Sequence, residues 1–103
     1  MKLSEENKRK LASSLVIELR SWFKKDLDII IKVYEAIGHI KFKALRTYNF
    51  ALFLVNQYEA YFKTEQGYFK TEQGLLNYVK SDLNDLSRTI RHNLVISEML
   101  NDK

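Results

Sequence analysis

The residues that most often carry catalysis are few in this chain of 103 residues, and their spacing assembles no site. Cysteine is absent, which excludes a disulfide framework, a thiolate metal site and a cysteine nucleophile. His39 and His92 lie far apart in the sequence, and neither has a second ligand three or four residues away, as a helical metal pair needs. Asp82 and Asp85 have the spacing of charges on a helix surface. We therefore expect no enzyme, no metal and no cofactor.

Basic side chains concentrate in the first half of the chain. Lys and Arg outnumber Asp and Glu by 17 to 13, and residues 1–46 hold 11 of the basic and 6 of the acidic residues. Lys41, Lys43 and Arg46 form a cluster without acids. Such a cluster is compatible with a polyanionic partner and is equally typical of a solvated helix face.

The overall composition predicts one globular domain over residues 1–103. A hydrophobic fraction of 46% supports one core and excludes a two-domain enzyme. The longest apolar run, 50–55, is far short of the roughly 20 residues of a membrane span, and no signal segment opens the chain. We expect a cytoplasmic protein that does not enter a membrane.

Two helices are predicted in the first part of the chain. Ser4 is a candidate N-cap, and apolar residues then recur every three or four positions, which predicts a helix over 4–25. Asp26 can cap a second helix that ends at Gly38. Whether residues 25 and 26 bend the chain stays open. The expected buried positions are Leu11, Leu15, Leu19, Trp22 and Phe23 in the first helix, and Leu27, Ile30, Ile31, Tyr34 and Ile37 in the second.

The basic cluster is predicted to lie on a short helix over 39–46, with Ile40, Ala44 and Leu45 on one face. Thr47 is a candidate N-cap for the next helix, which runs to about Tyr58. That helix is apolar nearly all round, which indicates full burial or an interface. Its expected buried face is Ala51, Leu54, Val55 and Tyr58. Phe50, Leu52 and Phe53 are further apolar residues that lie outside this face.

A direct duplication follows: residues 61–67, Tyr-Phe-Lys-Thr-Glu-Gln-Gly, are repeated without change in 68–74. Both copies open with aromatic residues, and three residues ending in Gly67 separate the two runs, which predicts a β-hairpin. Gly74 would let the chain leave this hairpin and enter the last helix. A helix interrupted by Gly67 is the alternative, and the duplication is either natural or engineered.

Nothing breaks a helix from Leu75 to about Asn101. Its apolar residues keep the spacing of a coiled coil for about two heptads. At 1.5 Å per residue the helix is roughly 40 Å long, which is too long for so small a domain to bury, so we expect a homodimer. The expected dimerisation residues are Leu76, Val79, Leu83, Leu86, Ile90 and Leu94.

The predicted order of elements is that of a winged helix-turn-helix, in which the hairpin is the wing. Residues 68–76, Tyr-Phe-Lys-Thr-Glu-Gln-Gly-Leu-Leu, resemble the second wing strand and following helix of PadR-like regulators and of small archaeal winged-helix proteins with a C-terminal coiled coil. Lys70 departs from the pattern, which usually has an aliphatic residue there. The resemblance implies a mainly α fold with a small β-hairpin: an N-terminal helix over 4–25, a helix-turn-helix and wing over 26–74, and a dimerisation helix over 75–101.

The resemblance also implies a DNA-binding surface. The helix after Thr47 is similar in place to a recognition helix, whose first residues enter the major groove. Arginine and asparagine can bind base edges there, whereas lysines neutralise phosphates. Leu52, Phe53 and Glu65 are unfavourable residues for this role. The implied DNA-binding residues are Lys41, Lys43, Arg46, Tyr48, Asn49, Asn56, Lys63 and Lys70.

Two functions follow as hypotheses. The first is a homodimer that binds double-stranded DNA with sequence preference, as a transcriptional regulator or as a plasmid or viral partition-site or DNA-organising protein, with a further protein partner. The second is an all-helical protein interaction module of the immunity or inhibitor type that does not bind DNA. Extended strands within 60–74 discriminate between them, because only the first requires a hairpin there.

Overall fold

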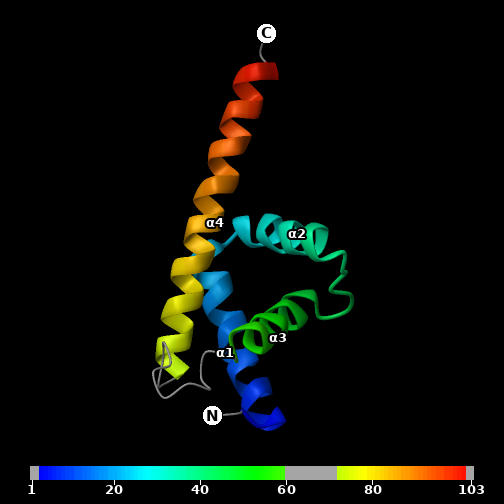
Figure 1. Ribbon diagram of the computed structural model, residues 1–103, viewed down its shortest axis with the longest axis vertical. Coiled ribbons are helices and arrows are strands. Elements are labelled where there is room, and N and C mark those ends of the chain that lie inside the picture. The colour runs from blue at the N-terminus through cyan, green and yellow to red at the C-terminus, as the bar shows by residue number, and fades with distance from the viewer. Residues whose placement is uncertain (1–2, 60–71, 102–103) are drawn as a thin grey trace.

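The computed structural model describes residues 3–59 and 72–101, and every element in this part of the chain is a helix (Figure 1). The helices are α1 (Glu5–Phe23), α2 (Asp26–Gly38), α3 (Arg46–Tyr58) and α4 (Glu72–Asn101). The C-terminal part of α4 projects beyond the other three helices (Figure 1). The prediction of a winged helix with a β-hairpin is therefore wrong: the described chain is all-helical.

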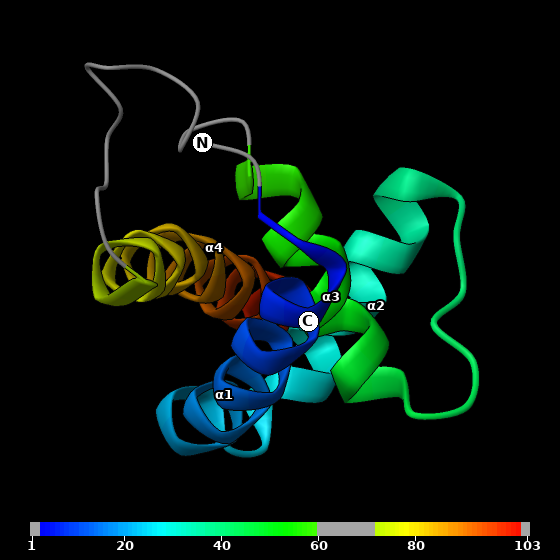
Figure 2. The same ribbon diagram turned by 90° about the horizontal axis from the view of Figure 1, so that it is seen from below.

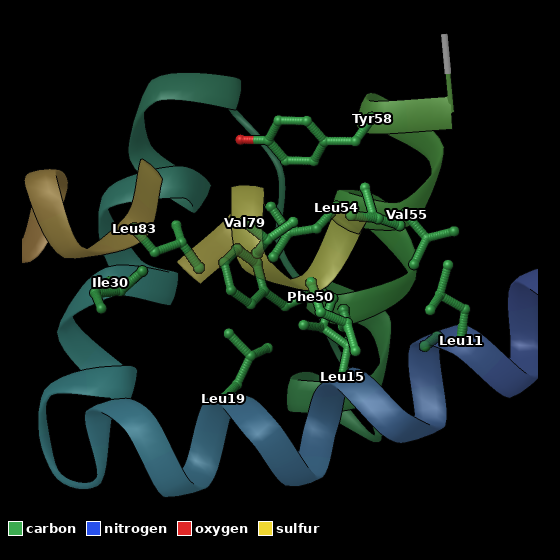
Figure 3. Close-up of a cluster of buried hydrophobic side chains, with 14 of the residues drawn as sticks. Leu11, Leu15, Leu19, Ile30, Phe50, Leu54, Val55, Tyr58, Val79 and Leu83 are labelled. Carbon is green, nitrogen blue, oxygen red and sulfur yellow. The ribbon is translucent and has the colours of Figure 1, made fainter. Parts of the chain in front are cut away.

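All four helices contribute to one hydrophobic core (Figure 3). The most extensive packing is between α1 and α3. Complete burial of an aliphatic or aromatic side chain contributes about 1.5–3 kcal/mol, so these residues dominate the stability of the fold. The fully buried side chains include Leu15 and Leu19 of α1, Ile30 of α2, Phe50 and Leu54 of α3, and Val79 and Leu83 of α4.

The start of α1 and the break between α1 and α2 follow from local chemistry. The Ser4 hydroxyl oxygen accepts the Asn7 backbone N–H at 3.1 Å, which confirms the predicted N-cap. Residues 24 and 25 do bend the chain, because α1 ends at Phe23 and Lys24 has a φ of 48°. Four of the predicted buried residues of α1 are confirmed, namely Leu11, Leu15, Leu19 and Phe23, whereas Trp22 is only half-buried. Ile37 at the end of α2 is 76% exposed instead of buried.

The predicted short helix over 39–46 is wrong, because residues 39–45 form a loop. The helix α2 includes Gly38, and His39 ends it in the left-handed conformation with φ 51°. The Ile40 backbone N–H then donates to the Glu35 carbonyl at 3.0 Å, which closes the end of α2. Phe42 turns inward and is buried, so the chain cannot continue as a solvent-facing helix. The next helix has Leu45, and not Thr47, at its N-cap.

Part of the predicted hairpin belongs to α4. Glu72, Gln73 and Gly74 form the first turn of this helix, and residues 60–71 lie outside the described part of the chain. Gln73 Nε2 donates to Asn77 Oδ1 at 3.0 Å, one helical turn away. Gly74 costs about 1 kcal/mol within a helix relative to alanine. Burial of Leu75, Leu76 and Val79 directly after it offsets that cost, so the helix extends back into the duplicated segment.

Candidate interaction surface at the α2–α3 loop

The α2–α3 loop, residues 39–45, lies on the side of the molecule away from α4 (Figure 2). It begins at His39 and ends at Leu45, and both residues are left-handed, with φ of 51° and 56°. Residues other than glycine adopt this backbone conformation at a free-energy cost of about 1 kcal/mol or more. Such a conformation persists only where surrounding contacts impose it.

The contacts that impose the loop conformation centre on Glu35 of α2. One carboxylate oxygen, Oε2, accepts the Phe42 backbone N–H at 3.0 Å, and the other, Oε1, accepts Arg46 Nη2 at 2.7 Å. Arg46 also forms an ion pair with Asp28, so its guanidinium links two acids of α2 to the start of α3. The hydrogen bond from Arg46 holds the pKa of Glu35 below its ordinary value.

Two further anchors hold the loop against α3. Asn49 Nδ2 donates to the Ala44 carbonyl at 2.7 Å. The Phe42 ring packs edge-on against Phe50 and Phe53, with 5.6 Å between ring centroids in each pair. The loop is thus fixed at its middle and at its end, and is preformed before any partner arrives.

The fixed loop presents apolar and basic side chains to solvent. Leu45 and Ile40 of the loop are 76% and 41% exposed, and Ile37, just before the loop in the last turn of α2, is 76% exposed. These are three of the five exposed large hydrophobic residues in the described chain. Lys41 and Lys43 are exposed and form no ion pair with any described residue. An open groove of about 440 Å³ separates the loop from α3. Its lining residues are Ile40, Lys41, Phe42, Lys43, Asn49, Leu52, Phe53 and Asn56.

Of the residues predicted to bind DNA, the structure brings Lys41, Lys43, Asn49 and Asn56 together at the groove. Arg46 and Asn49 are engaged in the internal contacts that hold the loop, and neither offers its side chain freely to a base edge. Tyr48 is half-buried against the core. Lys63 and Lys70 lie outside the described residues.

The residues predicted to form a dimer contact pack in the hydrophobic core of their own chain, as far as their side chains are described. Val79 and Leu83 are fully buried, and Leu76 is nearly so. Leu86 and Ile90 are half-buried against the same core. Leu94 lies further along α4, and its side chain is outside the described part. A homodimer through α4 stays a prediction.

The described residues offer neither a metal site nor a membrane-spanning helix. Residues 3–59 and 72–101 contain no group of three histidine or carboxylate side chains that could hold a metal ion. None of the helices in these residues combines the length and apolarity that crossing a membrane requires.

The carboxylates beneath the loop predict a pH dependence. Because the folded-state pKa of Glu35 lies below its ordinary value, its contribution to stability is complete above about pH 4.3 and is lost as the pH falls through the folded-state pKa. The pKa of Asp28 is also lowered, chiefly by Lys32 and then by Arg46, so its contribution to stability is lost in acid as well.

Urea unfolding measured between neutral and acid pH should show this loss of stability. The Glu35→Gln variant should be less stable at neutral pH and show a flatter profile, whereas a profile as steep as that of the unmodified protein would contradict the role of Glu35.

Comparison with known proteins places the chain in no family. No protein family model, curated protein or solved structure matches it.

Proposed function

We propose that the chain is a non-catalytic protein interaction module whose α2–α3 loop binds an acidic, partly apolar segment of another protein. One observation carries this proposal: three large hydrophobic side chains are exposed within residues 37–45, Ile37 at the end of α2 and Ile40 and Leu45 on the preformed loop, beside two lysines without ion-pair partners among the described residues. Exposed apolar residues that gather in one place mark protein interaction sites.

The chemistry of the loop favours a protein over duplex DNA as its partner. Protein–DNA interfaces are more polar and more positively charged than protein–protein interfaces. Here, over residues 37–45, the exposed apolar side chains of Ile37, Ile40 and Leu45 outnumber the exposed lysines, Lys41 and Lys43. Arg46, the residue best suited to read guanine, is held by two carboxylates.

The groove also indicates what the partner must offer. Phe42, Leu52 and Phe53 give its floor an apolar character, so a hydrophobic side chain of the partner can bury there. Lys41 and Lys43 at the rim favour carboxylates on either side of that anchor. We therefore expect a short segment with one or two large apolar residues flanked by aspartate or glutamate.

A random peptide library displayed on phage tests this proposal. Selection on the immobilised protein should enrich acidic peptides with an apolar anchor. The synthetic form of the enriched peptide should bind Ile40→Ser about 5- to 30-fold more weakly than it binds the unmodified protein, since loss of an apolar contact buried by the peptide costs about 1–2 kcal/mol. The matched control is Ile17→Ser, because Ile17 is also exposed, at 70%, but lies on α1.

Two outcomes would count against the proposal. Enrichment of peptides without acidic residues would reject the predicted partner chemistry. Equal weakening by Ile17→Ser and Ile40→Ser would reject the loop as the binding surface. Tighter binding of random duplex DNA than of the enriched peptide, with loss of DNA binding in Lys41→Gln, would support the DNA-binding hypothesis instead.

Leu45 provides a further prediction, because its backbone conformation suits asparagine better than leucine. Leu45→Asn should raise the free energy of unfolding by up to about 1 kcal/mol, since asparagine adopts a φ of 56° at a lower cost than leucine does. The same variant removes an exposed apolar side chain, so it should bind the selected peptide more weakly. Urea unfolding and a peptide titration measure the two effects. A lower free energy of unfolding together with unchanged peptide affinity would show that the Leu45 side chain stabilises the fold and does not contact the peptide.

A further inference from the structure

A second concave surface, the α1–α4 cleft, lies at the opposite end of α2 from the loop. There the turn between α1 and α2 passes beside α4 (Figure 1). The cleft has a volume of about 550 Å³, within the range of roughly 300–1,000 Å³ that is usual for small-molecule sites. Its walls are residues 22–26, which run from the end of α1 through the turn to the start of α2, and Asn84, Ser87, Arg88 and Arg91 of α4.

Basic side chains dominate this cleft. Arg91 is paired with Asp26, the one acid in the cleft wall. Lys24, Lys25 and Arg88 make no ion pair with the side chains of residues 3–59 and 73–93, the ones that the structure describes. Three cations that line one cleft repel one another, and a bound anion removes that repulsion. The cleft therefore favours a ligand that carries several negative charges close together.

The backbone at Lys24 is a second, independent observation. Its φ of 48° and ψ of −119° fall in a region that glycine adopts readily and that other residues rarely adopt. A glycine would relieve this strain, whereas the lysine keeps it and adds an ammonium group to the cleft wall. Backbone strain that persists beside a cavity is characteristic of functional sites.

The cleft also has an aromatic wall and neutral hydrogen-bonding groups. Trp22 is half-buried in this wall, and Lys80 Nζ lies 5.5 Å from the centroid of its ring. Aromatic rings of this kind stack on nucleic acid bases. Asn84 and Ser87 add an amide and a hydroxyl group, which can hydrogen-bond to a sugar or to a base.

We propose that the α1–α4 cleft binds a nucleoside polyphosphate. The phosphate groups lie against Lys24, Lys25 and Arg88, and the base lies against Trp22. A chain of phosphates supplies the adjacent negative charges that these three cations require, and the base matches the aromatic wall. This binding is independent of the partner of the α2–α3 loop.

Trp22 is the only tryptophan in the sequence, so its fluorescence reports on the cleft without a signal from any other tryptophan. Adenosine triphosphate and inorganic tripolyphosphate should both change this fluorescence, and isothermal titration calorimetry should give the same affinities. Arg88→Gln should weaken both ligands at least about tenfold, because it removes a charge-assisted hydrogen bond. Arg9→Gln is the matched control: it removes the same charge from an exposed position on α1 outside the cleft and should leave both affinities unchanged.

Each remaining outcome would overturn the proposal. Absence of binding at about 1 mM of either ligand would reject an anion site. Equal weakening by Arg9→Gln and Arg88→Gln would show nonspecific attraction to a basic protein. If adenosine triphosphate binds no more tightly than tripolyphosphate, the base makes no contact with Trp22. A single-stranded oligonucleotide that binds more tightly than adenosine triphosphate would identify a nucleic acid strand as the ligand.

Discussion

Substitution of Leu83 by glutamate is expected to unfold the chain. Leu83 is fully buried in the core that the four helices share (Figure 3). A carboxylate there would lose its hydration without gaining a partner, and the leucine's packing would be lost as well. The combined cost exceeds about 4 kcal/mol, a large part of the 5–15 kcal/mol by which domains are stable. Far-ultraviolet circular dichroism should therefore show loss of helix.

The alternative expectation for Leu83→Glu comes from the coiled-coil interpretation of α4. If Leu83 faced a second copy of the chain, the variant would become a folded monomer with full helix content. Ser81→Glu is the matched control, because Ser81 is exposed on the same helix and receives the same charge. The control should stay folded. A folded, helical monomer of Leu83→Glu would contradict the burial of Leu83 within its own chain.

The second large effect is expected for Phe50→Ala, with a loss of about 3–5 kcal/mol in the free energy of unfolding. Phe50 is fully buried, and its ring packs edge-on against Tyr34 at 5.2 Å and Phe42 at 5.6 Å between centroids. Its removal opens a cavity where α3 supports the α2–α3 loop. The loop should loosen, which hydrogen exchange of the Phe42 amide would detect.

Leu52→Ala is the comparison for Phe50→Ala. Leu52 lies on the same helix but is only half-buried, at the groove instead of in the core centre. Its loss of stability in urea unfolding should be well below that of Phe50→Ala, and the Phe42 amide should stay protected. Similar losses for the two variants would show that the core is not centred on Phe50.

Periodicity predicted the helices because their buried positions repeat every three or four residues. The stripe through Leu11, Leu15 and Leu19 is confirmed, as is the buried face of α3. The same periodicity could not say what α4 packs against. A coiled-coil contact and a contact with helices of the same chain use the same spacing, so the residues around Val79 and Leu83 indicated a dimer while they also suit an internal core.

The loop and the start of α4 were mispredicted for a different reason, namely that tertiary contacts override local preference. A helix over 39–46 was plausible locally, but the burial of Phe42 and its backbone hydrogen bond to Glu35 bend the chain. The strand expected up to Gly74 had local support from aromatic residues. Packing of Leu75 and Val79 instead extends α4 back to Glu72.

Some signals for the candidate surfaces were present in the sequence and were missed. Asp28 and Glu35 are seven residues apart on one helix, so their side chains share a face and one cation can link both. That spacing could have indicated an internal role for Arg46. The positive φ of Lys24 and Leu45 could not be foreseen, because neither residue type favours it.

An amide chemical-shift map by NMR, recorded with and without the peptide selected on the protein, tests the proposed function most directly. Binding through the α2–α3 loop predicts that the largest shifts fall on residues 37–45 and on the groove residues Leu52, Phe53 and Asn56 of α3. The amides of residues 22–26 and 84–91, at the α1–α4 cleft, should stay unchanged. Shifts centred on that cleft, with the loop amides unmoved, would contradict the assignment of the α2–α3 loop as the protein-binding surface.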